Sequence, residues 1–346
     1  MPNAHDPSNP SIPAATAMPA FVQVHRDDAQ AIRDELAAGL CAPAAHIAPK
    51  FLYDALGSRL FDAITELPEY YPTRTEASIF RAQGAAMAKL VPAGGVLVDL
   101  GAGSCAKAAG LFPVLKPGGY VAVDISVDYL RAALNGLQQR HADLPMLGLG
   151  LDFSQTLALP APAEDWLSGQ GLGSAPRTVF YPGSSIGNFS PEQSLELLRQ
   201  AHALCRAGGD GSGLLIGVDL VKSTDLLVPA YDDALGVTAA FNRNLLLNVN
   251  RWLGADFQPA HWAHRALFDP ALSRIEMHLQ ARTDQTVHWS GGERRFVAGE
   301  RIHTENAWKW TPERFAGLLQ SAGFGPPIHW TDDASWFGVF WAPAMR

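Results

Sequence analysis

The sequence is short of cysteine and of charge, and it contains no long apolar run. Its three cysteines, Cys41, Cys105 and Cys205, fit neither a disulfide framework nor a Cys-x-x-Cys metal site. Charged residues make up 17% of the 346 residues and give a net charge of −8, which argues against a nucleic-acid-binding surface. No apolar run approaches the roughly 20 residues that span a bilayer. We therefore expect a cytoplasmic protein with a small-molecule partner, bound to neither nucleic acid nor membrane, and a monomer.

The N-terminal quarter predicts a tail followed by helices. The first twenty residues lack the basic and apolar segments of a signal peptide, and their prolines predict a disordered tail over 1–24. Residues 25–90 show helical spacing of apolar residues. Within them, Thr73 and Glu76 form a T-x-x-E capping box, which predicts that a helix starts near Arg74. The tyrosine pair 70–71 would then lie in a loop just before that helix.

Residues 91–221 alternate short apolar segments with helical ones. Five segments predict buried strands, and they lie at 95–104, 120–126, 146–153, 177–185 and 213–220. Ser190, followed by Pro191 and Gln193, predicts the capped start of a helix. This alternation is typical of a mostly parallel, doubly wound sheet, so we predict an α/β, Rossmann-like fold.

The alternation stops after residue 221. Residues 222–305 first predict helices and then paired strands, whereas residues 306–346 predict one more helix and two apolar strands. We therefore expect an inserted α+β lobe, formed by 222–305 together with the N-terminal helices of 25–90. In this interpretation 91–221 binds a cofactor and 306–346 returns to the main sheet.

A glycine-rich turn after the first strand of this sheet predicts a nucleotide site. Gly101 and Gly103 would let a nucleotide approach the backbone closely at a helix N-terminus. Asp124 ends the next strand and is suited to ribose hydroxyls, while Asp152 and Phe153 end the third and are suited to an adenine. NAD and S-adenosylmethionine both suit such a site. The apolar hairpin at the end of the chain favours S-adenosylmethionine, and an NAD-dependent oxidoreductase stays open as the alternative.

Two further patterns suggest other chemistry. Residues 183–187 match G-x-S-x-G, the nucleophile elbow of α/β-hydrolases, but the predicted helix starts at Ser190, which is too late for an elbow. His261 and His264 have metal-ligand spacing without a third ligand, so we expect a surface pair and no metal.

Several long segments resemble one family, the histidine-specific Nα-methyltransferases of ergothioneine biosynthesis. The segments are PKFLYDALGSRLFDAITELPEYYPTRTE (49–76), DLGAGS with Lys107, PGSSIGNFSP (182–191), VDLVKSTDLLVPAYDDALGVTAAFNRN (218–244), RIEMHLQART (274–283) and IHTENAWKW (302–310). The resemblance covers nearly everything from residue 28 to residue 342. It implies a class I methyltransferase that uses S-adenosylmethionine, yields S-adenosylhomocysteine and has no metal.

The resemblance also implies roles for individual residues. Cofactor-binding residues would be Gly101, Gly103, Lys107, Asp124, Asp152 and Phe153. The catalytic set would be Tyr53, Tyr70, Asn188 and Tyr231. The substrate-binding set would be Tyr70, Gly183, Asn188, Tyr231, Met277, Glu305 and Ala307. In this interpretation Tyr70, Asn188 and Tyr231 hold the α-carboxylate and amine. Tyr70 also lies over the cofactor's methyl group, and Glu305 holds the imidazole.

These roles imply methyl transfer to the α-amino nitrogen of histidine, three times, to give hercynine. Transfer from a sulfonium needs mainly a neutral, well-aimed amine, so proximity and orientation account for most of the rate acceleration. One position departs from the family, because Ala307 stands where the family typically has serine. We expect weaker histidine binding as a result, and another amino acid stays open as the substrate.

Overall fold

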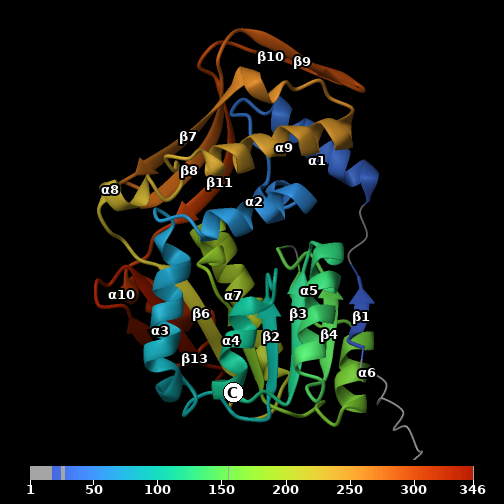
Figure 1. Cartoon of the computed structure of the whole chain (residues 1–346), viewed down its shortest axis with the longest axis vertical. Coiled ribbons are helices and arrows are strands. Elements are labelled where there is room, and N and C mark those ends of the chain that lie inside the picture. The colour runs from blue at the N-terminus through green and yellow to red at the C-terminus, as the bar shows by residue number, and fades with distance from the viewer. Residues whose placement is uncertain (1–17, 25–27, 155, 346) are drawn as a thin grey trace, which may run out of the picture.

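The computed structural model describes residues 18–24, 28–154 and 156–345. Figure 1 shows two stacked parts, with a helix-covered sheet below and a smaller lobe of helices and antiparallel strands above. Within the described residues the large sheet has eight strands, ordered β1 (Ala20–Gln23), β4 (Met146–Gly150), β3 (Gly119–Asp124), β2 (Val96–Leu100), β5 (Arg177–Tyr181), β6 (Gly213–Asp219), β13 (Phe337–Pro343) and β12 (Ile328–Thr331).

The strand directions confirm the predicted doubly wound sheet. Strands β1 to β6 of this sheet all run parallel to one another. Strand β13 is antiparallel to both of its neighbours, β6 and β12. Every residue of β2, β4, β5 and β6 is buried, which is expected when helices cover both faces of a parallel sheet. The covering helices are α3 (Tyr71–Met87), α4 (Ala106–Leu115), α5 (Val127–Arg140), α6 (Ala161–Gly169), α7 (Pro191–Arg206) and α10 (Pro312–Ser321). Helix α7 starts with the predicted capping box between Ser190 and Gln193.

The upper lobe has its own hydrophobic core. A three-stranded antiparallel sheet has the order β11 (Arg301–Trp308), β8 (Arg274–Ala281), β7 (Trp262–Asp269), and β9 (Gln285–Trp289) pairs with β10 (Gly292–Phe296). Four α-helices and two 3-10 turns complete it: α1 (Ala29–Cys41), η1 (Pro49–Leu52), α2 (Ala55–Thr65), α8 (Thr224–Leu227), α9 (Val237–Leu253) and η3 (Pro259–His261). Side chains of the N-terminal helices and of the 222–308 segment share one buried cluster, so the two segments fold together.

The last residues of the predicted disordered tail, 1–24, are ordered in the structure. Residues 20–23 form β1, which pairs in parallel with β4 at the edge of the sheet. A Cβ on Gly148 would lie 2.4 Å from the ring of Phe21, so this glycine leaves the space that the ring fills. The guanidinium of Arg131 lies 3.8 Å from the same ring. Residues 1–17 of the predicted tail lie outside the described residues.

Three other details differ from expectation. Helix α3 begins at Tyr71 and not near Arg74, since Pro72 is compatible with the first turn of a helix, and no side chain caps it. The carboxylate of Glu76 is therefore available for another use. Strand β11 of the lobe runs to Trp308, beyond the expected boundary at 305.

In the described ranges, no helix combines the length and the apolar character needed to cross a membrane.

Candidate active site

The larger of two neighbouring cavities lies at the carboxyl ends of β2, β3 and β4. It has a volume of about 540 Å³. Five of the six predicted cofactor residues line it: Gly101, Gly103, Asp124, Asp152 and Phe153. Lys50 of the lobe also lines this cavity, and its Nζ lies 3.8 Å from a carboxylate oxygen of Asp152. The cavity is therefore walled by the sheet on one side and by the lobe on the other.

Asp124 binds the glycine-rich turn through a backbone hydrogen bond. Gly101 and Gly103 have φ values of 67° and 51°, the left-handed region that glycine adopts without strain. The backbone N–H groups of Gly103 and Ser126 donate to the two Asp124 oxygens at 2.9 and 2.8 Å. Burial raises the pKa of Asp124, while these backbone donors lower it in part. A Cβ on Gly101 would lie 3.9 Å from the ring of Phe153, so the bare glycine widens the cavity beside that ring.

Lys107, the sixth predicted cofactor residue, is not among the residues that line either cavity. Its Nζ donates to Glu76 Oε2 at 2.7 Å, and the other Glu76 oxygen accepts the backbone N–H of Gly183 at 2.8 Å. Glu76 is 1% exposed. The pattern of residue types did not reveal this contact, because Thr73 offered Glu76 a local partner.

The smaller cavity, about 50 Å³, contains the predicted catalytic residues. All four line it: Tyr53, Tyr70, Asn188 and Tyr231. Three further predicted substrate residues also line it: Gly183, Met277 and Glu305. Tyr53 and Asn188 also line the larger cavity, so the two spaces share a wall. The rings of Tyr70 and Tyr231 meet edge to face with centroids 6.5 Å apart. The sequence-based set is thus gathered where the sheet meets the lobe.

The phenol groups in this cavity are uncharged. Burial raises the pKa of Tyr53, Tyr70 and Tyr231 well above the ordinary value, and the nearby Glu305 raises each further. At neutral pH each phenol therefore keeps its proton and can donate a hydrogen bond.

Glu305 is the carboxyl group of the smaller cavity. It lies on β11 next to a bulge and opposite Met277 of β8. Burial raises the pKa of Glu305 to about 8, although Lys309 lowers it in part. Asn188 Nδ2 donates to Glu305 Oε1 at 3.2 Å. Because the pKa lies near neutrality, this carboxyl group can either donate or accept a proton at the end of the cavity.

Ala307 is not among the residues that line the smaller cavity. It is buried in the lobe core, two residues beyond Glu305 on β11. Alternate residues of a strand point to the same face, so Ala307 lies on the face that carries Glu305. Its predicted role in substrate binding stays a prediction.

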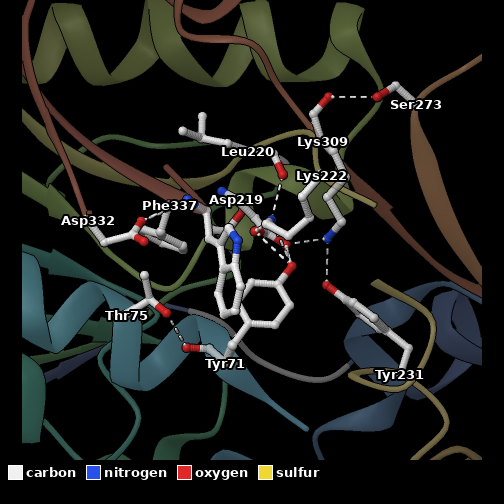
Figure 2. Close-up of polar contacts among 12 residues, drawn as sticks. Tyr71, Thr75, Asp219, Leu220, Lys222, Tyr231, Ser273, Lys309, Asp332 and Phe337 are labelled. Carbon is white, nitrogen blue, oxygen red and sulfur yellow. Dashed lines mark hydrogen bonds and ion pairs between the residues drawn. The ribbon is translucent and has the colours of Figure 1, made fainter. Parts of the chain in front are cut away.

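A buried ionic cluster behind Tyr231 was not anticipated from the sequence. Asp219, the last residue of β6, forms ion pairs with Lys222 and with Lys309, the latter at 2.8 Å (Figure 2). Tyr71 donates to Asp219 Oδ2 at 2.7 Å, and Lys309 Nζ donates to the Tyr231 hydroxyl at 2.8 Å. Burial alone would raise the pKa of Asp219, but Lys309 and Lys222 bring it below the ordinary value. Tyr71, the first residue of α3, is thus a polar member of this cluster.

The two other sequence patterns have structural explanations. Ser185 of the G-x-S-x-G match lies in the 3-10 turn η2 (Ser185–Asn188), and its hydroxyl donates to the Pro182 carbonyl at 3.3 Å. The long helix that an elbow requires begins only at Pro191. His264 is buried on β7 and bonds the Tyr231 carbonyl, so the expected surface pair was wrong.

Comparisons with known proteins identify the relatives of the chain. A family model described as histidine-specific methyltransferase, SAM-dependent, matches residues 32–344. A histidine N-alpha-methyltransferase of Mycolicibacterium smegmatis is 39% identical over 90% of this chain and 94% of that protein. Its namesake from Mycobacterium tuberculosis is 36% identical over 89% and 94%. The ergothioneine biosynthesis protein 1 of Neurospora crassa is 28% identical over 81% of this chain and 31% of that protein.

Proposed function

The chain belongs to the SAM-dependent, histidine-specific methyltransferases, and we propose that it transfers three methyl groups to the α-amino nitrogen of L-histidine, which gives the trimethyl betaine hercynine on the ergothioneine pathway. It is an S-adenosylmethionine-dependent amino acid N-methyltransferase. The NAD-dependent oxidoreductase that the nucleotide-binding pattern left open is therefore excluded by family. The one observation that carries the proposed mechanism is that Tyr53 and Asn188 line both cavities.

The larger cavity fits S-adenosylmethionine. Its volume, its glycine-rich turn and the carboxylates of Asp124 and Asp152 suit a nucleoside with polar hydroxyls and an exocyclic amine. We assign the ribose to Asp124 and the adenine to Asp152 and Phe153. Lys107, next to Gly183, is assigned to the carboxylate end of the cofactor. When bound, S-adenosylmethionine supplies an electrophilic methyl carbon on its sulfonium sulfur.

The smaller cavity fits an amino acid. Tyr231 and Asn188 are the proposed partners of the α-carboxylate, and Tyr70 and Tyr53 the proposed partners of the amine. Neutral phenols suit this role, because they hold the substrate without adding charge beside a sulfonium. Aromatic faces also attract the growing quaternary ammonium by cation–π interaction, at about 0.5–2 kcal/mol each.

Glu305 is the proposed partner of the imidazole. Its carboxyl can accept from a ring N–H or donate to a bare ring nitrogen, because its pKa of about 8 is near neutrality. The aligned phenols then hold the amine toward the larger cavity, and the proton of the amine leaves to solvent, with a tyrosine as relay. Positioning provides most of the acceleration.

The experiment that tests this proposal is a methylation panel. The protein is incubated with S-adenosylmethionine and each amino acid separately, and products are followed by mass spectrometry. Histidine should give mono-, di- and trimethylated species in turn and should outcompete the others. A preference for tryptophan, leucine or proline would refute the histidine assignment and favour the second candidate, another amino acid suited to Ala307. Accumulation of the monomethyl product alone would refute the triple transfer.

Two further properties belong to the proposal. We propose that the protein is cytoplasmic, supported by its three free cysteines, two of which are buried, and that it is a monomer. Size-exclusion chromatography with light scattering checks the monomer, and cell fractionation checks the location. A dimer in solution or a membrane-bound fraction would contradict it.

A further inference from the structure

The buried cluster behind Tyr231 controls which hydrogen bond that tyrosine can make. Lys309 is 2% exposed, and its ammonium group carries donors and no acceptor. The contact of 2.8 Å between Lys309 Nζ and the Tyr231 hydroxyl therefore uses the phenol oxygen as the acceptor. The phenol's own proton must then point elsewhere. Tyr231 lines the smaller cavity, so that proton is available to a group bound there.

The two lysines of the cluster have different neighbours: Lys222 Nζ donates to the Tyr71 hydroxyl, and Lys309 Nζ donates to the Tyr231 hydroxyl. Asp219 is shared by Lys222 and Lys309 (Figure 2). Burial lowers the pKa of Lys222 to about 8, although Asp219 and, less strongly, Asp332 raise it in part, whereas Lys309 contacts Tyr231. On the cavity side, burial raises the pKa of Glu305 to about 8, and the charge of Lys309 lowers it in part. Lys309 therefore presents its ammonium group to the Tyr231 hydroxyl while Asp219 remains its ion-pair partner.

We infer that Lys309 is a positioning residue, which holds Tyr231 as a hydrogen-bond donor into the smaller cavity and makes this site selective for a substrate that carries a carboxylate. The inference rests on the proposed function and names the group that orients the substrate. A carboxylate accepts hydrogen bonds, so it can bind the phenol proton that the Lys309 contact directs away from Lys309. An ammonium or a neutral donor in the same place would meet the phenol proton without being able to accept it, so the amino acid is bound with its carboxylate at Tyr231.

A purely structural ion pair is the alternative explanation for Lys309. Removing one partner from a buried pair destabilises the fold strongly, whatever its role in binding. Loss of activity after mutation thus proves nothing by itself. The decisive measurement compares the affinity for a ligand with a carboxylate and for one without it. A loss of stability alone would weaken the binding of both ligands equally.

The experiment compares histidine with histamine, which lacks the carboxylate, in calorimetric titrations with S-adenosylhomocysteine present. Lys309→Met should weaken histidine binding by about 10- to 100-fold, the range expected for one hydrogen bond to a charged group, and change histamine binding by less than about threefold. Lys309→Arg should restore much of the preference for histidine. Lys222→Met, which keeps the Lys309–Tyr231 contact, is the matched control and should leave that preference unchanged.

A second variant keeps the test decisive if Lys309→Met does not fold. Tyr231→Phe removes the donor without leaving a buried charge unpaired, and it should erase the same preference. In the double variant Tyr231→Phe/Lys309→Met, the loss should be no larger than in Tyr231→Phe alone, since Lys309 acts through that hydroxyl. Equal losses for histidine and histamine, or additive losses in the double variant, would overturn the inference. Failure of the wild-type protein to methylate histidine would instead overturn the proposed function.

Discussion

The carboxylate of Glu76 accepts the backbone N–H of Gly183 at 2.8 Å and so joins the start of α3 to the turn that follows β5. Its second oxygen accepts from Lys107 on α4 at 2.7 Å. Gly183 has a φ of 79° and lines the smaller cavity. One buried side chain thus connects the proposed cofactor side of the site to the substrate side.

Glu76→Ala should destabilise the protein by about 1–3 kcal/mol and raise the KM for histidine, because Lys107 and the Gly183 N–H both lose their partner. The stability and the KM of Glu76→Gln should lie between those of Glu76→Ala and those of the wild type, since the glutamine carbonyl can still accept from the Gly183 N–H. Urea unfolding and steady-state kinetics measure the two effects. Glu196→Gln is the control, because its pair with Arg199 is exposed and should change stability by less than about 1 kcal/mol. Equal effects of Glu76→Ala and Glu196→Gln would contradict the prediction.

Asn188→Ala and Tyr231→Phe should raise the KM for histidine by about tenfold before they disturb cofactor binding, because each removes one substrate donor. Tyr231 gives the cleaner test, since it lines only the smaller of the two cavities whereas Asn188 lines both. Calorimetric titration with S-adenosylmethionine checks the second half of the prediction. A lost cofactor affinity with an unchanged histidine KM would refute it.

Glu305→Gln should stabilise the protein at alkaline pH. The pKa of Glu305 is raised by burial from 4.5 to about 8, so the folded state holds this proton more tightly than the unfolded state does. The stability from this group is fully present below about pH 4.5 and is lost as pH rises through about 8. Thermal unfolding should give equal melting temperatures near pH 4.5 and a variant higher by about 2–5 °C near pH 8.5.

The control for this pH series is Glu293→Gln, because the Glu293 side chain is 69% exposed. Its melting curve should follow the wild type at every pH. If Glu305→Gln also follows the wild type, Glu305 is ionised in the folded protein, and its proposed exchange of a proton with the imidazole is wrong.

Ala307→Ser should strengthen histidine binding several-fold, by about 0.5–1.5 kcal/mol. The hydroxyl would lie on the Glu305 face of β11, within the buried lobe core. Competition between histidine and other amino acids measures the change. Unchanged affinity would mean that the hydroxyl does not reach the substrate, in agreement with the absence of Ala307 from the residues lining the cavity.

Local patterns in the sequence were sufficient to predict the main sheet. Apolar runs that end in glycine or aspartate predicted β2, β3 and β4, and the capping box of Ser190 and Gln193 predicted the start of α7, because each depends on neighbours within a few residues. Strand β1 was missed because its stability comes from pairing with β4, more than 120 residues away. The resemblance to one family, and not the pattern alone, predicted the residues of the smaller cavity.

The ionic contacts of the site could not be predicted in the same way. Asp219 and Lys309 are 90 positions apart in the sequence, and they meet only after the lobe strand β11 has returned to the end of β6. Glu76 was assigned to its neighbour Thr73, whereas its partners are on α4 and after β5. A charged residue in sequence has many possible partners, and only the fold selects among them.

Strand β11 and its continuation carry both Glu305 and Lys309, four positions apart. An extended chain advances about 3.3 Å per residue, so the two side chains leave the backbone roughly 13 Å from one another. The same short stretch of main chain thereby sets the length of molecule that satisfies both ends at once. In the proposed binding mode, one end of the amino acid meets Glu305 and the other meets Tyr231, whose hydroxyl Lys309 holds. The backbone spacing of this stretch therefore contributes to the length of substrate that fits, together with the side chains that line the cavity.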